Sequence, residues 1–71
     1  MSTFPVAVSV NGEWRQVARG TTLDLLVAEL TRAGGGVAAA VNETVVPRGN
    51  WARTPLGEGD RVEVLTAVQG G

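Results

Sequence analysis

Few side chains in this sequence of 71 residues could carry covalent chemistry. Cys and His are absent, and all six basic residues are Arg, so Lys is absent as well. In enzymes, Cys, His and Lys are the usual general bases and covalent nucleophiles, and Cys and His are the usual zinc and iron ligands. Seven Asp and Glu residues remain, but so short a chain has little room for both a core and a substrate cleft. We therefore expect no catalytic residue and no metal site, and favour a substrate, carrier or binding module over an enzyme.

The carboxylate after Gly70-Gly71, with which the sequence closes, is the best remaining group for covalent chemistry. A terminal carboxylate is ionised at neutral pH and is a weak nucleophile. Inside a partner enzyme it could attack the α-phosphate of ATP and become an acyl-adenylate with a good leaving group. Because glycine has no Cβ, two in succession form the thinnest peptide that can enter a narrow catalytic channel. We predict that Gly71 is modified by a partner enzyme.

The predicted domain that precedes this tail begins with a β-hairpin. Apolar residues alternate with others at the start, which predicts a half-buried strand with one face formed by Phe4, Val6, Val8 and Val10. Asn11-Gly12 follows, and both residues tolerate the positive φ of a type I′ turn. Residues 13–17 are therefore predicted to be the return strand, and we assign Asn11-Gly12 no role beyond the turn.

A single helix is predicted next. Apolar side chains at spacings of three and four share one helical face, formed by Leu23, Leu26, Val27 and Leu30. Thr21 with Asp24 resembles a capping box, and Thr22 is an equal candidate for the cap. The glycines at 34–36 are expected to end this helix after about three turns.

Three further strands complete the pattern. The apolar run 37–41 fits a strand buried on both faces, and 44–46 fits a short strand ended by Pro47, which cannot donate to a ladder. Residues 50–56 are typical of an irregular or single-turn connection, and 57–60 of a turn. Residues 61–68 are predicted to form the last strand, with one face made of Val62, Val64, Thr66 and Val68.

The order strand, strand, helix, strand, short strand, strand predicts an α+β fold. A hairpin that needs cover, followed by one helix with one apolar face, favours a mixed sheet of four to five strands packed on that helix. This is the β-grasp, or ubiquitin-like, arrangement. We expect a single β-grasp domain over residues 1–68 and a flexible tail over 69–71.

Packing explains both tryptophans best, because tryptophan supplies much of the burial in a small core. Trp14 and Trp51 are accordingly assigned to the interior. Arg61 and Glu63 alternate with valines and are expected on a solvated face of the sheet.

Three residues are candidates for docking to a partner. Leu65 and Ala67 share the outward face of the last strand close to the tail, where apolar side chains can form a binding patch. Arg48 follows Pro47, and it either contacts a partner or only helps to shape the turn.

Charge and hydropathy exclude other partners. The net charge is −1 with no cluster of either sign, which argues against nucleic-acid binding. The longest apolar run, 37–41, is too short to cross a bilayer, and the first residues lack the pattern of a signal peptide. We expect no nucleic acid and no membrane as partners, and a cytoplasmic location.

Sequence motifs add a resemblance that covers nearly the whole chain. They are Val-Asn-x-x-Val-Val-Pro-Arg-x-x-Trp at 41–51, Thr-x-Leu-x-x-Gly-Asp-x-Val-Glu-Val at 54–64 and Thr-Ala-Val-Gln-Gly-Gly at 66–71. With Val-Asn-Gly at 10–12 and Thr-Leu-x-x-Leu-Val-x-x-Leu at 22–30, the chain resembles the ThiS family of sulfur carriers of thiamine biosynthesis. The Val-Val-Pro-Arg-x-x-Trp and Gln-Gly-Gly parts are the most specific.

This resemblance implies a carrier that partner enzymes act upon. A ThiF-type adenylyltransferase would use ATP to adenylate Gly71, and sulfur drawn from a cysteine desulfurase would convert it to a thiocarboxylate. Gln69 and Gly70 would be recognised as the tail enters, and thiazole synthase, ThiG, would receive the sulfur. The chain itself would bind no permanent cofactor.

Three other functions stay open at this point. The small subunit of molybdopterin synthase shares the fold, tail and activation, although its tail usually carries a proline-containing segment that residues 66–69 lack. A ubiquitin-like modifier would form isopeptide adducts with target lysines. A plain regulatory β-grasp domain would not need Gly71.

Overall fold

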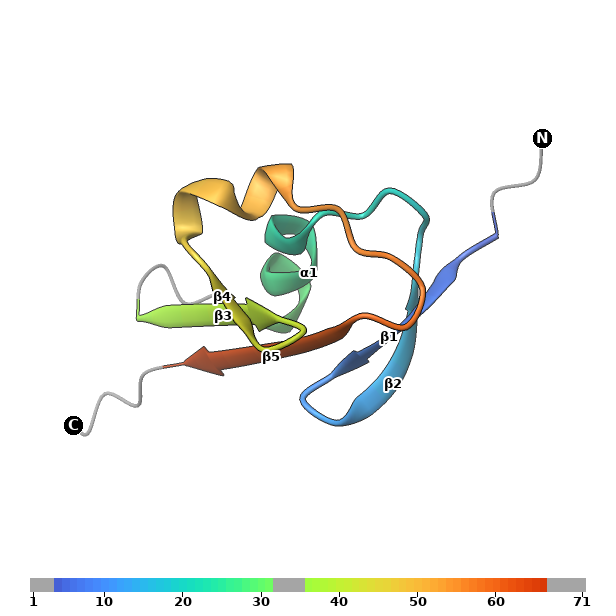
Figure 1. The fold of residues 1–71 in the computed structure, drawn as a ribbon, viewed down its shortest axis with the longest axis horizontal. Helices are drawn as coiled ribbons and strands as arrows, with labels where there is room; N and C mark the ends of the chain where they lie inside the picture. Colours follow the sequence, from blue (N-terminus) through green and yellow to red (C-terminus); the bar gives the residue numbers. More distant parts are fainter. Residues whose placement is uncertain (1–3, 32–35, 67–71) are drawn as a thin grey trace.

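The computed structural model describes residues 4–31 and 36–66. These ranges contain a sheet with its helices on one side (Figure 1). In chain order the elements are β1 (Val6–Val10), β2 (Glu13–Val17), α1 (Leu23–Leu30), β3 (Val37–Val41), β4 (Thr44–Val46), the 3-10 helix η1 (Arg48–Arg53) and β5 (Arg61–Thr66).

The sheet has five strands in the order β2-β1-β5-β3-β4. Its central pair, β1 and β5, is parallel, whereas β1–β2, β3–β5 and β3–β4 are antiparallel. The first and last strands of the chain are therefore neighbours in the middle of the sheet. The predicted mixed sheet packed on one main helix is confirmed.

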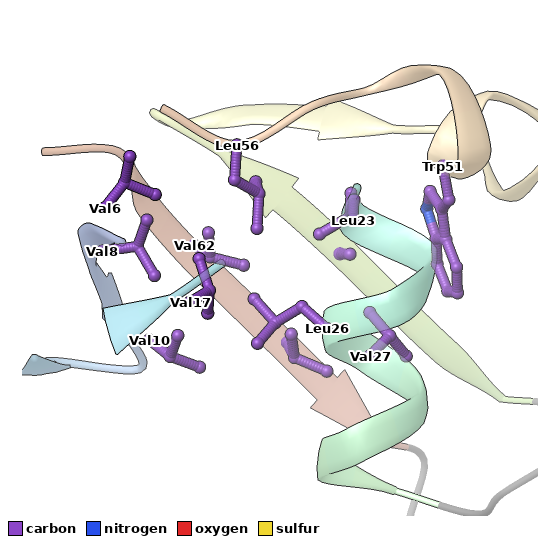
Figure 2. Close-up of a cluster of buried hydrophobic side chains, with 12 residues drawn as sticks. Val6, Val8, Val10, Val17, Leu23, Leu26, Val27, Trp51, Leu56 and Val62 are labelled. Carbon is purple, nitrogen blue, oxygen red and sulfur yellow. The ribbon is translucent and has the colours of Figure 1, made fainter. Parts of the chain in front are cut away.

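The core lies between the sheet and α1. Strand residues two apart point to the same face, and one such set from each central strand turns toward the helix. Figure 2 shows these side chains meeting Leu23, Leu26 and Val27 of α1. The buried hydrophobic residues are Val6, Val8, Val10, Val17, Leu23, Leu26, Val27, Ala39, Trp51, Leu56, Val62 and Val64.

The helix is shorter than predicted, and its ends differ from those expected. Thr22 is the N-cap, so the Thr21–Asp24 capping box is wrong; the Thr22 hydroxyl donates to the Asp24 carboxylate and caps no backbone group. Helix α1 has eight residues, and Thr31 already has an extended backbone while its N–H donates to the Val27 carbonyl. The glycine run therefore does not end the helix, because the helix stops where its apolar face runs out.

Two aromatic side chains predicted to pack are exposed. Strand β1 begins at Val6, which leaves Phe4 outside the strand and in solvent. Trp14 is 67% exposed. Val10 faces the core and is opposite Glu13, so Trp14, opposite Ser9, points to the outward face. The packing assignment for Trp14 is therefore wrong, whereas that for Trp51 is confirmed.

Strand β3 is buried on one face only. The prediction of burial on both faces is wrong, because within the described residues the helices cover only one side of the sheet (Figure 1). Ala39 is fully buried on that side, whereas Ala38 points outward and is exposed. Small apolar side chains on the outward face thus become available for contacts.

The connection after β4 is more regular than predicted, since η1 begins at Arg48. The turn at 57–60 is confirmed by the Asp60 N–H, which donates to the Gly57 carbonyl at 3.1 Å. Residues two apart share a face of a strand, so Thr66 lies on the same face of β5 as Val62 and Val64, as predicted, but at the end of the strand it is exposed. Val68 and the predicted boundary between domain and tail lie outside the described residues.

Candidate functional site: the last strand and the outward face of the sheet

The predicted reactive end lies outside the described residues, as do Gln69, Gly70, Gly71 and Ala67. The structure describes the strand that leads to them. Strand β5 ends at Thr66, five residues before Gly71. It pairs with β1 on one side and with β3 on the other. The chain therefore runs toward Gly71 from the central strand of the sheet.

A turn between β3 and β4 holds the beginning of β5. Asn42 has a φ of 51° in this turn. Its N–H donates to the Arg61 carbonyl at 2.7 Å, and its side-chain Oδ1 accepts from the Arg61 N–H at 2.9 Å. Its Nδ2 also donates to Asp60 Oδ1 at 3.0 Å. Both the backbone and the side chain of Asn42 thus fix where β5 starts.

The turn before β5 is tied to β1 by two further hydrogen bonds. The Gly59 N–H donates to the Ala7 carbonyl at 2.8 Å, and the Ala7 N–H donates to Glu58 Oε1 at 2.9 Å. Gly59 has a φ of 85°, a backbone conformation that residues other than glycine rarely adopt. Asp60 Oδ2 accepts from the Gly57 N–H at 2.7 Å and closes this turn.

Asn11 holds the second half of β5, at Val64. Its Oδ1 accepts from the Val64 N–H at 2.8 Å, and its Nδ2 donates to the Val64 carbonyl at 3.2 Å. Our assignment of Asn11-Gly12 to a turn and nothing more is wrong. Asn-Gly and Asp-Gly serve a type I′ turn equally well, so the local pattern carries no sign of this contact between residues 53 apart.

An apolar patch lies on the outward face of the sheet, beside the end of β5. Leu65 is 70% exposed, and register places it next to Ala38 of β3. Ala40 lies opposite Val45 of β4, which is also exposed. These four side chains, which we call the outward patch, line one shallow hollow.

Charged residues border the outward patch. Glu43 and Glu63 line its hollow. Arg61 forms an exposed ion pair with Glu43, with 3.6 Å between guanidinium and carboxylate. The predicted exposure of Arg61 and Glu63 is confirmed. An apolar centre with a charged border is the usual anatomy of a protein-binding surface.

The third docking candidate, Arg48, lies elsewhere. It begins η1, which is on the helix-bearing side of the sheet (Figure 1). Its guanidinium stands over the Trp51 ring, 5.0 Å from the ring centroid, a cation–π arrangement. Leu65 lies on the outward face of the sheet, opposite the side that bears the helices. The structure therefore does not bring Arg48 together with Leu65.

The described ranges contain no cluster of three or more His, Cys, Asp or Glu side chains suited to a metal ion. Within those same ranges no helix is both long enough and apolar enough to cross a bilayer. The cytoplasmic location stays a prediction.

Comparison with known proteins gives a consistent set of relatives. The model of the ThiS family matches residues 8–71. The sulfur carrier protein ThiS of Escherichia coli (strain K12) is 33% identical over 61 residues, which cover 86% of this chain and 92% of that protein. A crystal structure of the thiamine biosynthesis protein (ThiS) from Geobacter metallireducens has a TM-score of 0.75 and 29% identity, and the match covers 93% of this chain and all of that one.

Two further relatives are much longer proteins. The thiazole synthase of Paramagnetospirillum magneticum is 31% identical over 62 residues, and that of Magnetococcus marinus is 38% identical over 64 residues. The matches cover 87% and 90% of this chain but only 19% and 20% of those enzymes. A region similar to this chain is thus joined to a much larger remainder in both.

Proposed function

This chain belongs to the ThiS family and is a sulfur carrier of thiamine biosynthesis, and from that premise we propose that Gly71 carries the sulfur as a thiocarboxylate. The observation that carries the proposal is the position of Gly71. The family match extends to this residue, and the strand that leads to it is the central strand of the sheet. The chain is a carrier and not an enzyme, so partner enzymes perform the chemistry.

The reaction needs two steps at one carboxyl group. The Gly71 carboxylate attacks the α-phosphate of ATP in the active site of a ThiF-type adenylyltransferase, which releases pyrophosphate and forms the acyl-adenylate. A persulfide that carries sulfur from a cysteine desulfurase then attacks the acyl carbon and displaces AMP, which gives an acyl disulfide. A thiol of the partner enzymes cleaves the sulfur–sulfur bond, becomes a disulfide itself and releases the thiocarboxylate. Gln69 and Gly70 lead the carboxylate into the active site, where the absence of a Cβ at Gly70 keeps the entering chain thin.

Thiazole synthase is the proposed acceptor of the sulfur. Support comes from the two thiazole synthases in which a similar region occupies about a fifth of the protein. Covalent linkage raises the effective concentration of one protein at the other, so such a fusion is expected where the two act in succession. The same relatives favour this function over the three alternatives that the sequence left open.

The outward patch is the proposed docking surface for these enzymes. Exposed apolar side chains surrounded by charged ones mark interaction sites, and Leu65 places this patch on the strand that leads to Gly71. Ala67 stays a predicted member of the surface. Arg48 stays a predicted contact, although its position over Trp51 already accounts for it through packing.

Intact-mass measurement tests the proposal at Gly71. We expect incubation with ATP, a ThiF-type enzyme and a sulfide source to yield an adenylate and then a protein heavier by the difference between sulfur and oxygen. Gly71→Val should abolish both products without changing the unfolding midpoint, because the buried core of the described residues ends at Val64.

Gly49→Ala is the matched control for this variant. A Cβ at position 49 meets no atom within 4 Å, so this glycine substitution should preserve both folding and activation. Absence of adenylate and thiocarboxylate from the wild-type chain would contradict the proposed function. Isopeptide adducts as the main product would instead indicate a protein modifier.

A further inference from the structure

One edge of β5 loses its neighbouring strand before β5 ends. Strands β1 and β5 pair at only two positions, Ser9 with Arg61 and Val10 with Val62. Beyond them the chain turns away at Asn11, whose N–H makes the last backbone hydrogen bond on this edge, to the Val62 carbonyl at 2.9 Å. The next residue of β5 with backbone groups on the same edge is Val64, because these groups alternate along a strand.

The Asn11 side chain takes the place of the missing strand. Its carboxamide accepts from the Val64 N–H and donates to the Val64 carbonyl, as a paired residue of β1 would. Val64 is buried, and an unpaired backbone group at such a site is costly. One side chain therefore extends the pairing of β5 by two residues, from Val62 to Val64.

We propose that Asn11 is a positioning residue for the reactive tail. The proposal rests on the function proposed for Gly71. Val64 directly precedes Leu65 of the outward patch and stands seven residues before Gly71. By holding Val64 on the edge opposite β3, Asn11 fixes the direction in which β5 runs from the docking surface toward the carboxylate in the partner's active site. Loss of the contact leaves β5 beyond Val62 held on its β3 edge alone, where pairing continues to Thr66, so the last residues before the tail are oriented less firmly.

Holding Val64 should speed the reaction because it orients the chain that leads to Gly71. Groups that are held ready for reaction avoid the entropic cost of being aligned, and small misplacements lower rates strongly. Loss of the contact between Asn11 and Val64 should therefore lower the kcat of adenylation, while the outward patch still binds the activating enzyme.

The chain offers a matched control in Asn42. Asn42 and Asn11 are the same residue type in tight turns, with φ of 51° and 50°. Each uses Oδ1 to accept a backbone N–H of β5, from Arg61 and Val64 respectively. They differ in place, because Asn42 holds the beginning of β5 and Asn11 holds its second half, at Val64. Glycine tolerates positive φ, so Asn11→Gly and Asn42→Gly should both keep their turns.

The test compares adenylation kinetics of the full chain at a temperature where every variant is folded. We expect Asn11→Gly to lower kcat by about fivefold or more, with KM within about twofold of the wild type. Asn42→Gly should change kcat by less than about twofold. Hydrogen exchange at the Val64 amide should accelerate about tenfold or more in Asn11→Gly only.

Asn11→Asp separates this role from turn formation. Aspartate also supports a type I′ turn, but an ionised carboxylate cannot donate to the Val64 carbonyl. We expect Asn11→Asp to be as slow as Asn11→Gly. Full activity of Asn11→Asp, or equal losses in the two glycine variants, would overturn the inference. A wild-type chain that is never adenylated would instead contradict the proposed function.

Discussion

At the scale of single residues, the two tryptophans have opposite environments. Trp51 is 5% exposed, its indole N–H donates to the Val46 carbonyl at 2.8 Å, and Arg48 lies over its ring. Trp14 points outward from an edge strand. The Val46 carbonyl belongs to β4, the other edge strand. The Trp51 side chain therefore packs in the core and also donates a hydrogen bond to an edge strand.

Substitution by phenylalanine should distinguish the two. Trp51→Phe removes the indole donor and leaves the Val46 carbonyl without it, so we expect a loss of about 1–3 kcal/mol in the free energy of unfolding. Trp14→Phe should change it by less than about 0.5 kcal/mol. Urea unfolding followed by circular dichroism measures both, and equal losses would contradict the difference in burial.

At the scale of elements, one face of α1 carries the packing. Leu26 is fully buried, whereas its neighbour Leu25 is 54% exposed. Both are leucines inside the same helix, so replacing either with alanine changes helix propensity by the same small amount.

Alanine substitutions at these neighbours isolate the contribution of packing. We expect Leu26→Ala to lower the free energy of unfolding by about 2–5 kcal/mol, because it opens a cavity in the core. Leu25→Ala should cost less than about 0.5 kcal/mol. Denaturant titration gives both values, and a large loss in Leu25→Ala would place the wrong face of α1 against the sheet.

Periodicity predicted the elements well but not their ends or their partners. The alternation in β1 and the spacing in α1 are local, so every strand and the helix were found from the sequence. The end of α1 at Leu30 comes before the glycines that local signals favoured as its end, and the outward direction of Trp14 depends on its register with Ser9. Neither is encoded locally.

The candidate site was predicted in part for the same reason. Leu65 could be placed on the outward face by counting along β5. The contribution of Val45, Ala38 and Ala40 to the same patch needs the β5-β3-β4 order, and the contact from Asn11 to Val64 needs the parallel β1–β5 pair.

At the scale of the whole molecule, the two faces of the sheet are covered differently. One face is covered by α1 and η1 (Figure 1), and the other carries the outward patch. Exposed leucines occur on both sides of the molecule, since Leu65 lies on the outward face and Leu25 on the helix. Exposure alone therefore does not define the docking surface.

Placing a charge on each side tests which face binds the activating enzyme. We expect Leu65→Glu to raise the KM for adenylation by about tenfold, since central contacts of an interface contribute more than about 1 kcal/mol. Leu25→Glu should leave KM within about twofold. The reverse order of effects would move the docking surface to the helix-bearing side.

The place of β5 in the sheet also bears on how the chain is made. It is the last of the five strands to be synthesised, yet β1 and β3 both pair with it and not with each other. Until β5 has been made, the nascent chain can form only two separate ribbons, and a two-stranded ribbon is marginally stable in water. The distant pairing that joins them is the slow kind of contact in folding. The strand that completes the sheet is therefore also the strand that leads to Gly71, the proposed site of modification, so a chain truncated before β5 would lack both the joined sheet and the proposed reactive end.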